Sequence, residues 1–85
     1  MMESKWLIFK KIDKTKHKRI ANRKTDVWWV YSKSYDYLGL IEWYAPWRQY
    51  CYDNIPSDTV LAPSCLLDIA EFCKQETKAY RERKK

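Results

Sequence analysis

Only a few residues of this sequence have types and spacings that could support catalysis. The single histidine, His17, has no serine or cysteine near it in the sequence that it could activate as a nucleophile. Asp68 and Glu71 could face one divalent cation from the same side of a helix, but carboxylates in the first turns of a helix more often interact with its dipole. A chain with a single glycine cannot form a glycine-rich phosphate loop. We therefore expect no enzyme and no catalytic residues.

Three cysteines, Cys51, Cys65 and Cys73, are the other reactive side chains. On one helix, Cys65 and Cys73 would lie about 12 Å apart along the axis, too far to form a disulfide or to hold one zinc ion without other ligands. An odd cysteine count without a Cys-x-x-Cys pair is typical of free thiols in a reducing compartment. The sequence therefore predicts no metal and no cofactor.

The N-terminal segment indicates where the protein acts. It carries charged residues after only four consecutive apolar positions, unlike a secretory signal, and no apolar run of about 18 residues follows anywhere in the chain. We expect a cytoplasmic protein without a membrane partner.

The charge is unevenly distributed along the 85 residues. Residues 1–24 carry a net charge of +7, residues 25–73 carry −5 and residues 74–85 carry +4, so the overall charge of +6 comes from the two ends. Basic segments of this kind attract nucleic-acid phosphates, although they can also be simply solvated ends. The residues that we expect to contact nucleic acid are Lys14, Lys16, Lys18, Arg19, Arg23, Lys24, Arg48, Arg81 and Arg83.

Aromatic residues are concentrated in the middle of the chain. Residues 28–52 hold four of the five tryptophans and six of the seven tyrosines. Exposed rings on a sheet can stack on bases or form the centre of a protein interface, and they can also complete a second small core or a homodimer contact. The aromatic contact surface that we predict consists of Tyr44, Trp47, Tyr50 and Tyr52, with Arg48 among them.

These residues must be positioned by a small α+β domain that spans residues 1–85. Alternating apolar residues predict strands over 5–12, 26–32, 37–44 and 47–52, and a brief edge strand over 59–62. Residues 13–25 have too few apolar side chains to bury a face, which favours a long, flexible basic loop. We expect an antiparallel meander of three to four strands with one C-terminal helix packed on one face.

The helix and one strand carry more detailed expectations. Ser64 is a good N-cap, and the spacing of Leu66, Ile69, Ala70 and Cys73 predicts the buried stripe of a helix, which Cys65 and Phe72 widen. Residues 79–85 are expected to form a frayed basic tail. Gly39 interrupts the strand over 37–44, which a bulge or a covering ring would explain. We predict that an aromatic ring covers Gly39.

Residues 28–72 also carry a distinctive pattern. It consists of WVYSKS at 29–34, L-G-x-I-x-W-Y-x-x-W-R-Q-Y-C-Y at 38–52, TV at 59–60 and C-L-x-D-I-A-x-F at 65–72. The pattern resembles small phage and prophage proteins to which no function is assigned. The resemblance implies a phage-encoded accessory protein that acts in a bacterial cytoplasm, and it carries no catalytic residue over.

Two classes of function follow from these observations. In the first, the basic segments contact the phosphates of nucleic acid, while Arg48 and the nearby rings contact bases. In the second, the aromatic surface binds and inhibits a host protein, for example a defence factor such as a CRISPR effector. The segregation of charge favours the first class. A ring-rich open face is also compatible with a homodimer.

Overall fold

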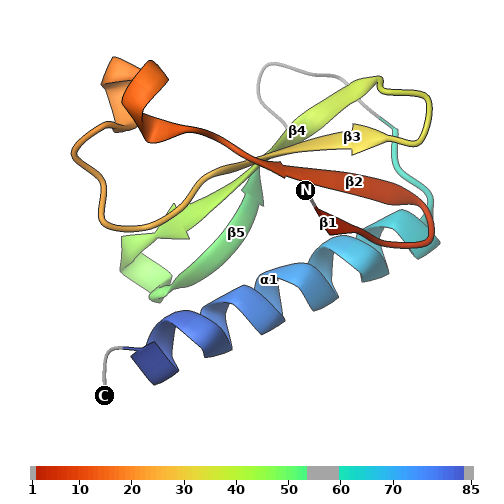
Figure 1. The fold of residues 1–85 in the computed structure, drawn as a ribbon. Helices are drawn as coiled ribbons and strands as arrows, with labels where there is room; N and C mark the ends of the chain where they lie inside the picture. Colours follow the sequence, from red (N-terminus) through yellow and green to blue (C-terminus); the bar gives the residue numbers. More distant parts are fainter. Residues whose placement is uncertain (1, 54–59, 84–85) are drawn as a thin grey trace.

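The computed structural model describes residues 2–53 and 60–83, which form a five-stranded antiparallel sheet followed by one helix (Figure 1). The elements are β1 (Met2–Glu3), β2 (Leu7–Lys11), β3 (Trp28–Ser32), β4 (Tyr37–Tyr44), β5 (Gln49–Asp53) and α1 (Pro63–Arg83). The strands lie in the sheet in chain order, and α1 packs across one face. The predicted meander with a C-terminal helix is therefore confirmed, with the two-residue β1 as an addition at one edge.

Strand β3 lies in the centre of the sheet, as its two apolar faces predict. Trp28 and Val30 point toward α1 and are fully buried, while Trp29 and Tyr31 lie on the opposite face, which we call the outer face. The ring of Phe72 on α1 stacks on Phe9 of β2, with centroids 4.1 Å apart. The core cluster consists of Leu7, Phe9, Trp28, Val30, Leu38, Ile41, Tyr50, Ile69 and Phe72.

Gly39 is covered by an aromatic ring, as predicted, and the ring comes from the following strand. A Cβ atom at Gly39 would lie 2.8 Å from Cε1 of Tyr52 and 2.6 Å from the backbone oxygen of Asp53. The Tyr52 hydroxyl donates a hydrogen bond to the carbonyl oxygen of Leu38 at 2.7 Å. The pairing of β3 with β4 shifts beside this point, so Leu38 joins the core and does not share the face of Leu40.

Helix α1 differs from expectation at its first residues and along its buried face. It begins at Pro63, which fits the first turn because the missing N–H has no partner there, and Ser64 lies inside the helix and does not precede it. Ile69 and Phe72 of the predicted stripe are buried, but Leu66 and Ala70 are exposed and Thr77 is buried in addition.

The C-terminal part of α1 contacts the sheet through Tyr80. Tyr80 contacts Trp43 with ring centroids 4.6 Å apart, and the helix continues to Arg83. The contact between Tyr80 and Trp43 thus stabilises the C-terminal part of the helix, where the sequence has few apolar residues.

The basic connection between β2 and β3 is built from two short 3₁₀ helices, η1 (Lys14–Lys16) and η2 (Lys18–Ile20). The Asp13 carboxylate accepts hydrogen bonds from the backbone N–H and the hydroxyl of Thr15, which fixes the first turn. Residues 13–25 therefore hold local structure that their low apolar content did not predict.

Two further points concern the remaining segments. The predicted edge strand over 59–62 lies partly outside the described residues, and residues 60–62 form no strand. Among the described residues, no helix is long and apolar enough to cross a membrane.

Candidate nucleic-acid interface

Three basic segments that are far apart in the sequence lie toward the same end of the molecule, on the left in Figure 1. The Arg23 guanidinium bonds the Glu42 carboxylate on β4 at 3.0 Å, which ties the 13–25 connection to the sheet. Arg81 Nη2 donates to the carbonyl oxygen of Arg48 at 2.8 Å, which ties the last turns of α1 to the hairpin between β4 and β5. We call this region the basic end. Its exposed cations are Lys16, Lys18, Arg19, Lys24, Arg48, Arg81 and Arg83.

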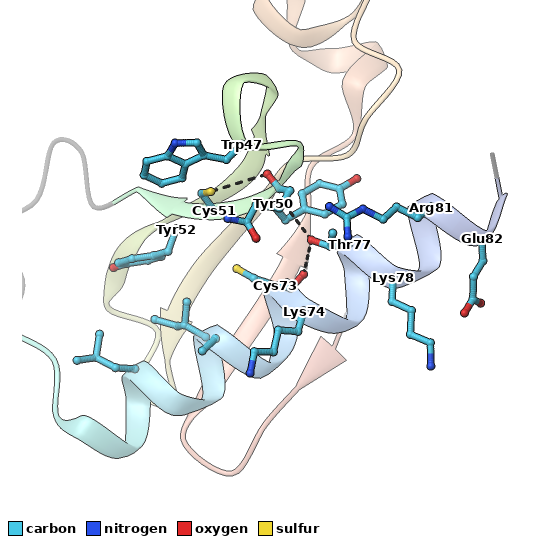
Figure 2. A pocket seen from close by; sticks show the side chains of 14 residues that line it. Trp47, Tyr50, Cys51, Tyr52, Cys73, Lys74, Thr77, Lys78, Arg81 and Glu82 are labelled. Carbon is cyan, nitrogen blue, oxygen red and sulfur yellow. Dashed lines mark hydrogen bonds between the residues drawn. The ribbon is translucent and has the colours of Figure 1, made fainter. Parts of the chain in front are cut away.

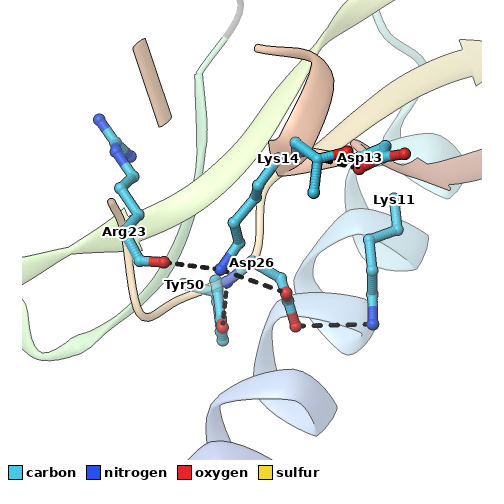
Figure 3. A network of polar contacts seen from close by, with 7 residues as sticks. Lys11, Asp13, Lys14, Arg23, Asp26 and Tyr50 are labelled. Carbon is cyan, nitrogen blue, oxygen red and sulfur yellow. Dashed lines mark hydrogen bonds and ion pairs between the residues drawn. The ribbon is translucent and has the colours of Figure 1, made fainter. Parts of the chain in front are cut away.

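Two of the cations predicted to bind nucleic acid have internal partners instead. Lys14 lies 3.7 Å from the Asp26 carboxylate and donates to the carbonyl oxygen of Arg23 at 2.8 Å (Figure 3). Lys11 approaches the same carboxylate at 3.6 Å, and Asp26 also donates its backbone N–H to the Tyr50 hydroxyl at 3.3 Å. Lys14 and Arg23 therefore help to position the basic connection, and part of their charge is balanced by Asp26 and Glu42.

The seven exposed cations of the basic end are available to a ligand. None of them forms an ion pair with a carboxylate in the described parts of the chain, 2–53 and 60–83. Arg48 follows the 3₁₀ turn of Ala45–Trp47 and has a left-handed backbone, with φ of 51°, which places it at the tip of the hairpin. This end therefore exposes positive charge from three segments.

The predicted aromatic surface divides into two pairs. Trp47 and Tyr44 are 65 % and 45 % exposed and meet edge to face at the hairpin, with centroids 4.8 Å apart. Tyr50 is only 3 % exposed and packs edge to face on Trp28 and Trp43. Tyr52 is half-buried against Gly39. Tyr50 therefore belongs to the core, whereas Tyr52 packs on Gly39 and keeps part of its ring at the surface, and burial raises the pKa of both hydroxyls.

A pocket of about 720 Å³ lies between the basic connection and the outer face of the sheet. Trp29 and Leu40 line the pocket from the sheet, and His17 lines it from the connection. The rings of His17 and Trp29 meet edge to face, with centroids 5.4 Å apart. Sequence reasoning did not select Trp29 as a site residue. Neighbouring residues of a strand point to opposite faces, so the sequence does place Trp29 on the face opposite Trp28. The position of residues 13–25 over that face, which brings cations next to Trp29, is seen only in the structure.

A second hollow, of about 780 Å³, runs between β5 and α1 (Figure 2). Trp47, Tyr52 and Leu66 supply apolar lining, and Cys51 and Cys73 lie on its two sides. Burial raises the pKa of the Cys73 thiol to about 12, so this thiol is protonated at neutral pH. The basic side chains on its rim are Lys74, Lys78 and Arg81.

The chemistry of a metal centre is not assembled in the part of the chain that the structure describes. There, no three histidine, cysteine, aspartate or glutamate side chains lie close enough together to hold a metal ion. The three cysteines are unpaired thiols.

Comparison with known proteins assigns neither a family nor a function to the chain. The chain matches no protein-family model, no curated protein and no solved structure. The resemblance to small phage and prophage proteins therefore stays a prediction. The case for a function rests on the geometry of the basic end and its two hollows.

Proposed function

We propose that this protein binds nucleic acid through its basic end. The observation that carries the proposal is the convergence of three basic segments whose exposed cations have no carboxylate partners among the described residues. Like charges that lie near one another without partners repel each other and do not stabilise the fold. A bound polyanion, by contrast, can form favourable contacts with all of them. The exposed rings of Tyr44 and Trp47 lie at the same end and offer faces on which bases can stack.

The internal ion pairs explain why these cations stay in place before a ligand arrives. The Arg23–Glu42 contact anchors the end of the basic connection, and the bonds of Lys14 to Asp26 and to the Arg23 carbonyl close it into a compact unit. A preformed arrangement loses less conformational freedom on binding than a free arm would. The basic connection therefore acts as part of a surface.

Salt dependence of binding is the direct test. If about five cations contact phosphates of a single strand, the logarithm of the affinity falls by about 3.5 per tenfold increase in salt, or about 100-fold between 50 and 200 mM. Fluorescence anisotropy with a labelled 20-nucleotide oligonucleotide and with its duplex measures this slope. Binding that does not change with salt, or no binding at 50 mM, would overturn the proposal.

A matched pair of variants separates the basic end from net charge. Lys18→Gln/Arg19→Gln removes two charges at the basic end, and Lys5→Gln/Lys33→Gln removes two charges from the turns at the other end of the strands. We expect the first variant to weaken binding at 100 mM salt by about 10-fold and to lower the salt slope by about 1.4. The second variant should change affinity less than 2-fold. Equal losses would show that the interaction depends on overall charge alone.

A protein partner is the second candidate, and the hollow between β5 and α1 favours it. Its lining is largely apolar, and Trp47 and Leu66 are exposed beside it. Large exposed apolar residues around a groove are typical of protein interaction sites. Leu66→Asp should then abolish capture of a specific host protein without loss of far-UV circular dichroism, while the oligonucleotide affinity stays unchanged.

The origin and setting of the protein belong to the same proposal. We infer from the sequence pattern that it is a phage or prophage accessory protein acting in the bacterial cytoplasm, where both nucleic acid and host defence proteins are available. A homodimer is tested by sedimentation at several concentrations, because an association through exposed rings depends on concentration.

A further inference from the structure

The pocket beneath the basic connection combines two kinds of surface that different ligands would need. Its floor is the outer face of the sheet, with the half-buried ring of Trp29 beside Leu40 and the buried side chain of Val27. Its volume of about 720 Å³ lies within the range of about 300–1,000 Å³ that is common for small-molecule sites. The floor is therefore large enough and apolar enough to receive a flat aromatic group.

The rim of this pocket is cationic. Lys16, Lys18 and Arg19 line it from the two 3₁₀ helices, and none of them is ion-paired with a described carboxylate. An inorganic anion would use this rim but not the floor, and an apolar ligand would use the floor but not the rim. A nucleotide unit uses both, because its base is a flat ring and its phosphates are negatively charged.

Polar groups stand where a bound base would present its edge. The Glu42 carboxylate and the Arg23 guanidinium both line the pocket while they bond each other at 3.0 Å. A carboxylate accepts hydrogen bonds from base amino groups, and a guanidinium donates to base carbonyl and ring-nitrogen acceptors. The ring of His17 meets Trp29 edge to face and closes one side of the pocket.

A base inside a duplex cannot reach such a floor. Its faces are covered by neighbouring base pairs, and it enters a pocket only after it leaves the stack, which costs much more free energy in paired DNA than in a single strand. The cations of the basic end, by contrast, can contact the phosphates of either form. Single strands and duplexes would thus share the electrostatic contacts and differ at the pocket.

We propose that this pocket receives one unpaired base, with its flanking phosphates on Lys16, Lys18 and Arg19, so that the protein prefers single-stranded to fully paired nucleic acid. The inference rests on the proposed function and names its ligand class. Trp29 is the residue on which the base stacks.

Trp29→Leu and Tyr31→Leu form the matched test, because both residues are half-buried on the outer face of β3 and only Trp29 lines this pocket. The probes are a 12-nucleotide thymidine strand and a 12-base-pair duplex, both labelled with fluorescein and measured by anisotropy at 100 mM salt. We expect Trp29→Leu to weaken single-strand binding by about 10-fold and duplex binding by less than 2-fold. Tyr31→Leu should change neither value by more than 2-fold.

A second readout uses the wild-type protein and does not depend on the folding of a variant. A 12-nucleotide strand with one 2-aminopurine should lose fluorescence on binding, because stacking on Trp29 quenches the base. If Trp29→Leu loses its far-UV circular dichroism, His17→Ala takes its place, with a single-strand loss above 3-fold expected.

The outcomes separate this inference from the proposed function. If the wild-type protein binds neither probe at 50 mM salt, the proposed function fails. If it binds both probes equally, without quenching of 2-aminopurine and with equal affinities for Trp29→Leu, the pocket inference is overturned and the electrostatic interface remains. Preference for the single strand that Trp29→Leu removes supports both.

Discussion

Replacement of Gly39 by alanine should destabilise the protein far more than one methyl group normally would. The added Cβ would lie 2.6 Å from the carbonyl oxygen of Asp53, 2.7 Å from the Tyr52 hydroxyl oxygen and 2.8 Å from Tyr52 Cε1. Carbon atoms at van der Waals contact are about 3.5–4.0 Å apart. Either β5 must move away from β4, or the Tyr52 ring must leave its place and give up its bond to the Leu38 carbonyl.

The magnitude follows from which of these groups can move. Overpacking usually costs about 1–3 kcal/mol, and we expect about 3 kcal/mol here because the closest atom belongs to the backbone of a paired strand. A domain of this size has a total stability of about 4–13 kcal/mol. The loss corresponds to a fall in Tm of about 12–24 °C.

Thermal and urea unfolding, followed by circular dichroism and tryptophan fluorescence, measure this loss. A double-mutant cycle with Tyr52→Leu separates the ring from the backbone, because leucine removes the ring contacts and leaves the Asp53 oxygen in place. Gly39→Ala should cost less in that background and still more than 1 kcal/mol. A cost below about 1 kcal/mol in the wild-type background would refute the close packing that we describe.

Two further predictions concern α1. Thr77→Val should destabilise the protein by about 1–3 kcal/mol. The Thr77 hydroxyl accepts a hydrogen bond from the buried N–H of Tyr50 at 3.0 Å, and valine would leave that donor without a partner. Urea unfolding measures the loss, and Thr77→Ser, which keeps the hydroxyl, should retain most of the stability. Stability should also fall as pH rises from about 9 toward 12, because the raised pKa of Cys73 keeps its thiol protonated in the folded state while the unfolded thiol ionises near its ordinary value of 9.0. Tyr50 and Tyr52, whose pKa values are also raised, add to this fall above pH 10, and Cys73→Ala should flatten its lower part. A Cys73→Ala curve that coincides with the wild-type curve would contradict this account.

The sheet could be predicted because its strands carry strong local patterns. Trp28 to Tyr31 alternate between two apolar faces, and the expected strand over 37–44 matches β4 residue for residue. Simple alternation along 37–44 would place Leu38 on the same face as Leu40, but Leu38 joins the core, because the pairing of β3 with β4 shifts beside it and such a shift depends on how two strands fit. The stripe of α1 was only partly right, since Ile69 and Phe72 face the sheet, where Phe72 stacks on Phe9, while Leu66 and Ala70 are exposed.

The candidate site was only partly predictable. The basic segments could be identified from the sequence, because the net charge of a segment is the sum of the charges of its residues. The pairing of Lys14 with Asp26 and of Arg23 with Glu42 could not be identified in this way. Sequence reasoning also assigned Tyr50 to the surface, whereas contacts with Trp28, Trp43 and Thr77 bury it. Both errors concern long-range partners, which depend on the path of the chain.

The bond between Thr77 and the backbone of Tyr50 also bears on how copies of this protein behave when crowded. The outer edge of β5 would otherwise offer its N–H groups as a template for another strand, but α1 occupies this edge at Tyr50. The opposite edge of the sheet is the two-residue β1, which is too short to recruit a partner securely. Pairing of two copies edge to edge is therefore disfavoured at Tyr50 and at β1, which lowers the tendency of crowded copies to join their sheets into fibres.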